Sequence, residues 1–177
     1  DYEFRSLSGF SVIDEIRIDA AVSRIDETHI VQPAVIGIQI ALFETLRHHG
    51  IHAEAITGHS IGEVASIYAS GSINLKQAAY LIYHRSRIQD KASNTGRMLA
   101  ASVSVERAIE LIGSDGGRVQ VATINGPAML TISGDEAPLL RIAGELEQQN
   151  IFCKFVNVKV PYHSHLMDPL KEEIIAF

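Results

Sequence analysis

The sequence has little of what a disulfide-bonded, membrane-spanning or nucleic-acid-binding protein needs. Its single cysteine, Cys153, excludes an internal disulfide and favours a reducing compartment. We expect no membrane-spanning helix, because no apolar run approaches the ~20 residues required. The first residues, 1–4, have neither the basic start nor the apolar segment of a signal peptide. Fifteen basic against 21 acidic residues argue against a nucleic-acid or anionic-membrane surface. We therefore predict a cytoplasmic protein with no nucleic-acid and no membrane partner.

What is present is an ordinary globular composition. Hydrophobic residues make up 46% and charged residues 20% of the 177 positions, enough to bury a core in one domain or in two small ones. The sequence does not begin with Met and stops at Ala176-Phe177, inside a helical pattern. From this we expect a piece of a longer polypeptide.

One motif carries a clear chemical signal, the stretch Gly58-His59-Ser60-Ile61-Gly62. G-x-S-x-G is the pattern of a nucleophile elbow, a sharp turn from strand to helix that leaves the serine Oγ exposed. The glycines have a physical task there, because the turn leaves little room for Cβ atoms and the helix packs close to the preceding strand. The flanks fit, since residues 52–57 alternate like a short strand and residues 63–70 favour a helix.

Helical patterns lie on both sides of this motif. From Gln32-Pro33 the chain is too apolar on all sides for a surface helix, so we expect a core helix that Pro33 opens and Gly50 ends. A second helix is predicted over 75–92. Three histidines near residue 50 lack carboxylate or cysteine partners at ligand spacing; we interpret them as a solvated helix end and expect no metal site.

Residues 98–158 have the pattern of a self-contained small unit. The expected order is strand, helix, strand, strand, helix, strand, which is that of a ferredoxin-like split βαβ unit. The predicted elements are strands over 98–104, 119–124, 129–133 and 152–158, and helices over 105–112, capped near Ser104, and 138–149.

A serine nucleophile needs a base from elsewhere in the chain. His163 and His165 follow a predicted strand and precede a helix that begins at Pro169, and active-site bases are often carried on such loops. An H-x-H pair without further ligands is a weak metal signal, whereas either histidine is a plausible base.

Four motifs taken together resemble a known family. They are Gly58-His59-Ser60-Ile61-Gly62-Glu63, His84-Arg85-Ser86-Arg87, Asn125-Gly126-Pro127 with Ser133-Gly134-Asp135, and Tyr162-His163-Ser164-His165-Leu166-Met167. In this order and spacing, from about Gln32 onward, they resemble the acyltransferase domains of polyketide synthases and the related malonyl-CoA:acyl carrier protein transacylase. The resemblance implies an α/β fold, with an α/β-hydrolase-like large subdomain over 1–96 and 159–177 and an inserted ferredoxin-like small subdomain over 97–158.

The resemblance also implies roles for individual residues. Ser60 would be the nucleophile and His163, four residues before Met167, the base. Arg85, 25 residues after the serine, would hold the free carboxylate of a malonyl-type acyl group by a bidentate pair, with Arg87 in reserve. Without the family match, a surface arginine on an amphipathic helix would be the favoured interpretation of Arg85.

The remaining implied site residues lie next to these. His59, Ile61 and Tyr162 would contact the substrate, and the backbone N–H of Ile61 would donate to the oxyanion. Members of the family often carry H-A-F-H or Y-A-S-H before the base, and this chain has Val160-Pro161-Tyr162-His163 instead. Because the bulky Tyr162 would crowd an α-substituent, we expect malonyl in preference to methylmalonyl or rarer units.

The implied activity is ping-pong transfer of the acyl group from CoA to the phosphopantetheine thiol of an acyl carrier protein, inside a larger synthase and without metal or redox cofactor. Two family features are missing from the sequence, an N-terminal G-Q-G segment with the second oxyanion donor and the C-terminal part of the core sheet. We therefore expect a partial domain, poorly active if the polypeptide consists of these residues alone.

Two other functions remain open at this point. A serine esterase of the α/β-hydrolase class would need Asp115 or Asp135 as its acid, and both lie in or beside predicted turns. A non-catalytic structural module of a synthase would keep the fold without turnover. The intact Ser60, His163 and Arg85 argue against the second alternative.

Overall fold

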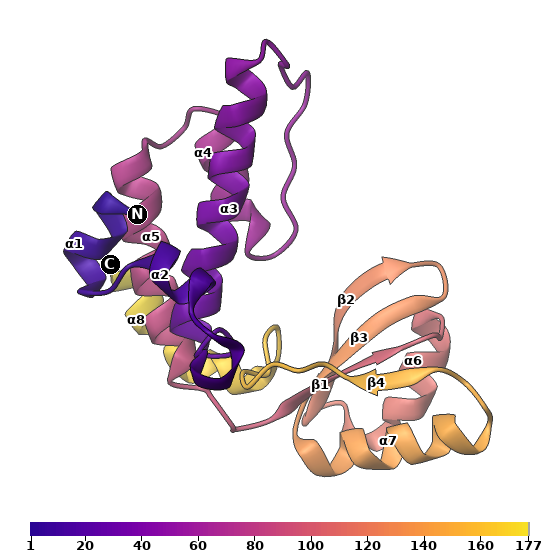
Figure 1. Cartoon of the computed structure of the whole chain (residues 1–177). Coiled ribbons are helices and arrows are strands. Elements are labelled where there is room, and N and C mark those ends of the chain that lie inside the picture. The colour runs from indigo at the N-terminus through magenta and orange to yellow at the C-terminus, as the bar shows by residue number, and fades with distance from the viewer. Residues whose placement is uncertain (177) are drawn as a thin grey trace. The chain divides into compact units, whose positions relative to one another are not determined.

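The structure is a computed structural model that describes residues 1–176. Its internal contacts divide the chain into two units, Asp1–Arg87 and a second that begins at Ile88. Helices and antiparallel strands are both present, so the predicted α/β class is correct (Figure 1). Each unit is described separately below.

The first unit consists of helices joined by turns and loops (Figure 1). They are α1 (Tyr2–Ser8), α2 (Val12–Arg17), a 3₁₀ turn (Ala20–Val22), α3 (Thr28–His48), α4 (Gly62–Ala69) and α5 (Leu75–Asp90), whose last residues belong to the second unit. The strand predicted over 52–57 is not formed, and these residues are exposed. A strand needs a partner for its N–H and C=O groups, and residues 1–87 contain no other strand to supply one.

Helix α3 begins earlier than the sequence indicates but ends where it predicts. It starts at Thr28, so Pro33 lies in its second turn and does not open it. At the other end, Gly50 has a φ of 78°, and the N–H groups of Gly50 and Ile51 each donate to a last-turn carbonyl over 3.0 Å, those of Arg47 and Leu46 respectively. These two bonds form a Schellman motif, so Gly50 ends the helix as expected.

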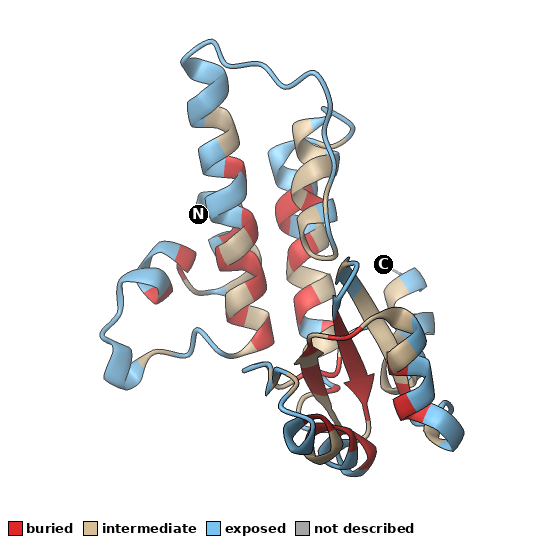
Figure 2. Cartoon of the chain, turned by 90° about the vertical axis from the view of Figure 1, so that its right-hand side faces the viewer, coloured by how far each residue is buried: buried red, intermediate tan, exposed pale blue. Residues whose placement is uncertain are grey.

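Only the first half of α3 is a core helix. Its buried residues lie between Thr28 and Ile40, whereas Ile38 and Leu42 are 54% and 58% exposed. The expectation of burial on all sides is therefore wrong for the second half (Figure 2). By length and composition alone this 21-residue helix could cross a membrane, contrary to the sequence-based expectation, although the core helix of a soluble protein meets the same criterion.

The core of the first unit joins α1, α2, α3, α4 and α5. All five helices contribute side chains to it, and α3 and α5 supply three buried residues each. The buried members are Phe4, Val12, Ala34, Ile36, Ile40, Val64, Ala78, Ala79 and Ile82.

The second unit is built around a four-stranded sheet (Figure 1). Its elements are β1 (Arg97–Ala101), α6 (Val105–Ile112), a 3₁₀ turn (Gly113–Asp115), β2 (Val119–Gly126), β3 (Met129–Gly134), α7 (Glu136–Gln148), β4 (Cys153–Phe155), a 3₁₀ helix (His165–Leu170) and α8 (Lys171–Ala176). The six elements predicted between residues 98 and 158 are present in the predicted order. The Ser104 hydroxyl accepts from the N–H of Arg107 and caps α6, as expected.

The strands lie in the order β2-β3-β1-β4, and every neighbouring pair is antiparallel. Leu99 opposes Ile132, which in turn opposes Val121, so alternate residues from three strands share one face. Strand β4 is shorter than predicted, because the N–H of Val158 donates to the carbonyl of Val156 over 2.9 Å and turns the chain away from the sheet.

Helices α6 and α7 cover the apolar face of this sheet, and the two central strands, β1 and β3, are mostly buried (Figure 2). Most members of this core are almost inaccessible to solvent. They are Leu99, Ala101, Val103, Ala108, Leu111, Ile112, Val119, Leu130, Ile132, Leu139, Ile142, Ala143 and Leu146.

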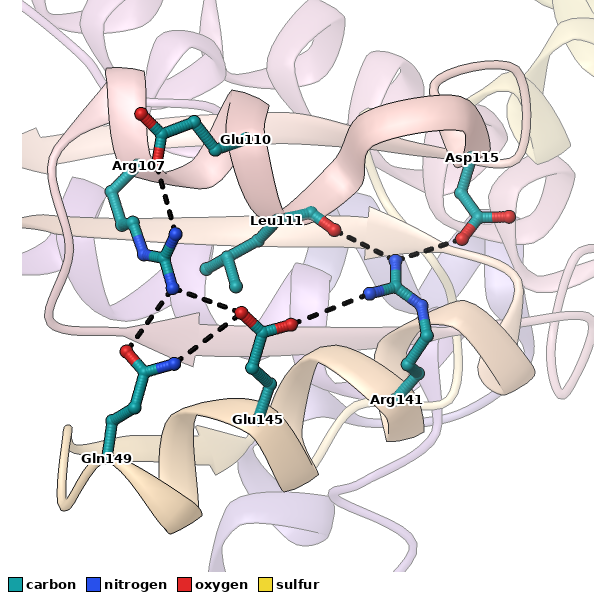
Figure 3. Close-up of polar contacts among 7 residues, drawn as sticks. All are labelled: Arg107, Glu110, Leu111, Asp115, Arg141, Glu145 and Gln149. Carbon is teal, nitrogen blue, oxygen red and sulfur yellow. Dashed lines mark hydrogen bonds and ion pairs between the residues drawn. The ribbon is translucent and has the colours of Figure 1, made fainter.

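A network of charged side chains joins α6 to α7 on the outside of this core (Figure 3). Arg107 donates to Glu145 of α7 over 3.0 Å and to Glu110 over 3.0 Å. Arg141 of α7 donates to the carbonyl of Leu111 over 2.8 Å, which satisfies a carbonyl in the last turn of α6. The ion pairs are largely exposed and therefore screened by solvent, so the apolar core supplies most of the stability of this unit.

Candidate functional site

The serine of the G-x-S-x-G motif lies at a strained turn in the first unit. Ser60 has a φ of 53°, in the left-handed region that non-glycine residues rarely adopt. The N–H of Gly62 donates to the carbonyl of His59 over 2.9 Å, and that of Glu63 to the carbonyl of Ser60 over 3.0 Å, so the chain enters α4 directly after the serine. This is the local geometry of a nucleophile elbow, without the preceding strand.

The two glycines of the motif are not equivalent. A Cβ on Gly58 would collide with the backbone of Gly62 and Glu63, so only glycine fits there. A Cβ on Gly62 would meet nothing within 4 Å among the described atoms. The sequence-based explanation is therefore correct for Gly58, whereas the structure shows no crowding at Gly62.

Helix α4 packs against the core of the first unit near its start and is bonded to α3 near its end. Val64 is buried in the core and Ile61 packs against it. Further along, the Tyr68 hydroxyl donates to Glu44 Oε1 over 2.9 Å. Burial raises the pKa of Tyr68 above its ordinary value, and the bond to Glu44 raises it further. The predicted substrate residue His59 lies next to Ser60 and is exposed, whereas Ile61 is half-buried.

The predicted carboxylate-binding arginine belongs to α5. Arg85 is half-buried, and its Nη1 donates to Oε1 of Gln32 on α3 over 2.5 Å. Gln32 is 4% exposed, a polar side chain among the mostly apolar buried residues of α3. This partner of Arg85 was not predicted; the amide among the apolar residues near the start of α3 is the signal that could have indicated it, because a buried polar group needs a hydrogen-bond partner. The reserve candidate, Arg87, is exposed and lies over the ring of Tyr83, with Cζ 5.2 Å from the centroid.

The predicted base lies on a loop of the second unit. His163 has a φ of 58° and is exposed, and Tyr162 before it is half-buried. Val160 and Pro161 are buried, and the Ser164 hydroxyl donates to the Pro161 carbonyl over 2.7 Å. The loop therefore has a buried stem that holds the exposed imidazole at its tip.

The second histidine of the pair contacts the sheet instead. Nε2 of His165 lies 3.4 Å from Asp135 Oδ1, and its backbone N–H donates to Gln120 Oε1 over 3.0 Å. Asp135 also binds Arg118 over 2.8 Å, and the other aspartate that an esterase could use, Asp115, binds Arg141 over 2.9 Å. Both aspartates are thus engaged by arginines.

Left-handed backbone marks the two predicted catalytic residues. Among residues 1–176, the non-glycine residues with positive φ are Ser60, Asn94, Asn150 and His163. Asparagine tolerates this conformation more readily than serine does. At Ser60 and His163 the surrounding structure must therefore hold the backbone in this region. Ser60 and Arg85 belong to the first unit and His163 and Tyr162 to the second. The predicted convergence of these groups on one acyl group stays a prediction.

No group of three or more His, Cys, Asp and Glu side chains that could hold a metal ion is found in the part of the chain that the structure describes.

Comparisons with known proteins bear on the whole chain. The sequence profile described as "Acyl transferase domain" matches residues 1–176. A Dictyostelium discoideum protein named "Probable polyketide synthase 27" is 37% identical over 99% of this chain, which spans 7% of that protein's length.

Solved structures with a similar fold include the following two. The acyltransferase domain of the polyketide synthase PpsC of Mycobacterium tuberculosis is 32% identical, with a TM-score of 0.84 over 97% of this chain and 51% of that one. The malonyl-CoA:ACP transacylase of Synechocystis sp. PCC 6803 is 24% identical, with a TM-score of 0.86 over 99% of this chain and 58% of that one. At 24% identity the second likeness shows the fold alone.

Proposed function

The chain belongs to the acyl transferase domain family, and on that premise we propose that it transfers a malonyl-type acyl group from CoA to the phosphopantetheine thiol of an acyl carrier protein. The transfer passes through an ester on Ser60. The observation that carries this proposal is the left-handed backbone of Ser60 and His163, with φ of 53° and 58°. Strain of this kind persists where surrounding contacts impose it, and it gathers at active sites.

The first half-reaction forms the acyl-enzyme. Ser60 Oγ attacks the thioester carbonyl while His163 takes its proton, and the resulting oxyanion is stabilised by the backbone N–H of Ile61. The tetrahedral intermediate then collapses, the C–S bond breaks, and the protonated imidazole returns the proton to the departing CoA sulfur.

The second half-reaction is the reverse of the first with a different thiol. The phosphopantetheine thiol of the carrier protein gives its proton to His163 and attacks the Ser60 ester, and the serine oxygen leaves and is reprotonated. Neither half-reaction needs a metal or a redox cofactor. The aspartates that an esterase would use are already engaged by Arg118 and Arg141.

Arg85 binds the free carboxylate of the acyl group in this proposal. Its guanidinium offers a planar fork suited to a carboxylate, and the bond from Nη1 to Gln32 fixes one side of it. His59, Ile61 and Tyr162 complete the substrate contacts, and the bulk of Tyr162 favours malonyl over α-branched units. These assignments depend on the sequence motif and on the local contacts within each unit.

The wider setting belongs to the same proposal. We infer that residues 97–158 form the ferredoxin-like small subdomain, inserted into an α/β-hydrolase-like one that includes 1–96 and 159–177. The order β2-β3-β1-β4 with α6 and α7 on one face supports the first assignment. Other domains of a synthase and its carrier protein are the expected partners, and the cytoplasm is the expected compartment.

Intact-protein mass spectrometry after mixing with a panel of acyl-CoAs tests this function. We expect a mass increase equal to the acyl group, which Ser60→Ala abolishes and which a carrier-protein thiol discharges far faster than water does. Arg85→Ala should lose malonyl and methylmalonyl but not acetyl groups. Rapid hydrolysis that ignores Arg85 would identify an esterase, and a folded protein that is never acylated would identify a structural module.

A further inference from the structure

We propose that His165 is a positioning residue for the base: it fastens the loop 160–166 to the four-stranded sheet and acts through His163, without touching the acyl group. The inference rests on the proposed function, because it assigns His165 a task in the same reaction. It begins from a requirement of the loop itself. His163 has a φ of 58°, and a left-handed backbone at a non-glycine residue persists only where the surrounding structure imposes it.

On both sides of His163, the loop is held by its own hydrogen bonds and by burial. Val160 is fully buried and accepts a 3.0 Å hydrogen bond from the N–H of Tyr162. Ser164, 7% exposed, closes a tight turn through its 2.7 Å bond to Pro161. These bonds fix the loop's internal shape but do not attach it to the rest of the unit.

Attachment to the sheet comes from His165, two residues after the base. Its backbone N–H donates to Gln120 Oε1 over 3.0 Å, and its Nε2 lies 3.4 Å from Asp135 Oδ1. Gln120 lies on β2 between Val119 and Val121, so its side chain points to the face opposite α6 and α7. The base loop therefore lies against the sheet face that the helices leave open.

Both acceptors are themselves fixed. Asp135 receives a 2.8 Å bond from Arg118 Nε on its other oxygen, and its backbone N–H donates to the Arg118 carbonyl over 2.9 Å. A Cβ on Gly134, whose φ is 145°, would collide with that same carbonyl, so the two segments lie as close as backbone allows. Gln120 is paired with Ser133 across the β2–β3 ladder. Because His165 contacts both Asp135 and Gln120, its position is fixed relative to the sheet.

The imidazole of His165 is suited to one polar contact. Its Nδ1 is buried and has no hydrogen-bond partner among the described atoms, whereas Nε2 faces Asp135. The side chain of Leu166, the next residue, lies so close to Gly96 that a Cβ there would collide with it. The loop therefore also packs against the residue that precedes β1. Replacing the ring by leucine would keep the apolar volume and lose the contact to Asp135, whereas glutamine would keep a nitrogen close to the Nε2 position.

The test compares His165→Leu with the matched variant His165→Gln in the full-length protein. Steady-state transfer from malonyl-CoA to acyl carrier protein gives kcat and KM, and quenched-flow mass spectrometry gives the rate of Ser60 acylation. We expect His165→Leu to lower kcat and the acylation rate by at least about tenfold, because a base misplaced by about 1 Å loses up to about 10²-fold. The KM for malonyl-CoA should stay within about twofold, and His165→Gln should recover most of the rate.

A second variant covers the case in which His165→Leu does not fold. Gln120→Met removes the acceptor of the His165 N–H from the neighbouring strand, and we expect it to lower kcat severalfold with KM unchanged. Wild-type kcat in His165→Leu, or equal losses in the Leu and Gln variants, would overturn the inference. If His165→Leu is unfolded, wild-type kcat in Gln120→Met overturns it.

The outcomes also separate this inference from the proposed function. A wild-type protein that is never acylated, or a His163→Ala variant that keeps its rate, contradicts the function itself. An acylated wild type with an inactive His163→Ala and a fully active His165→Leu contradicts only the positioning role.

Discussion

The two units of the chain differ in how completely they bury their apolar side chains. In the second unit, α6, α7 and the sheet enclose residues such as Leu130, Ile132 and Leu139, all within 1% of complete burial. In the first unit, most of the large apolar side chains outside the core are exposed, Ile38 and Leu42 among them. The nucleophile motif belongs to the open unit and the predicted base to the closed one. Single substitutions should therefore act differently in the two units.

Truncation of the core gives the largest expected difference between the two units. Ile132→Ala should lower the free energy of unfolding by about 2–5 kcal/mol, because it leaves a cavity between β3 and the two helices. Leu42→Ala, on the exposed half of α3, should change it by no more than about 0.5 kcal/mol. Chemical denaturation measures both values.

The two variants also test the contrast itself. If Leu42→Ala costs as much as Ile132→Ala, the exposed half of α3 is covered in the folded protein, and the difference between the units disappears.

The sequence predicts the second unit better than the first. Strands β1, β2 and β3 and helices α6 and α7 were predictable, because their apolar residues, such as Leu99 and Ala101, face a core that the unit completes by itself. The strand over 52–57 was predicted from equally good alternation and is not formed, because pairing partners decide whether a strand exists. Local pattern therefore identifies elements only where the partner is also present.

The candidate site shows the same limit at the level of single residues. The G-x-S-x-G spacing predicted the turn at Ser60, because the constraint is local and involves Gly58 directly. The bond between Arg85 and Gln32 joins residues 53 positions apart, and nothing in either local pattern specifies the other. The bond from the N–H of His165 to Gln120 likewise joins residues 45 positions apart, so only the folded unit brings them together.

The two glycines of the motif give the next largest effect. Gly58→Ala should lower the acylation rate of Ser60 by about 10²-fold, because its Cβ would push the turn away from the backbone of Gly62. Gly62→Ala should leave the rate unchanged and stabilise α4 by up to about 1 kcal/mol, since its Cβ meets open space. Time-resolved mass spectrometry and thermal unfolding of both variants measure these changes. Equal rates for the two variants would mean that close approach at residue 58 is not needed.

Replacing Gln32, the polar partner of Arg85, should give a smaller change in activity. Gln32→Leu removes the amide that receives Nη1, and we expect the KM for malonyl-CoA to rise about tenfold while that for acetyl-CoA stays constant. Gln39→Leu, an exposed amide on the same helix, is the matched control and should change neither value. A parallel rise for both donors would show that Gln32 acts on the fold and not on the guanidinium.

Reactivity of the single thiol should give the smallest effect, and it measures how tightly the second unit closes. Burial raises the pKa of Cys153, whose Sγ lies 3.6 Å from the carbonyl of Ala143, and Glu147 raises it further. Because the thiolate is the reactive form, a raised pKa means less thiolate at a given pH, so iodoacetamide at pH 8 should modify the folded chain severalfold more slowly than the chain in denaturant. The ratio should shrink as the pH approaches the raised pKa, where thiolate forms in the folded state too. Equal modification rates for the folded and denatured chains at pH 8 would mean that β4 opens readily. The second unit would then protect its core less completely than the contrast with the first unit requires.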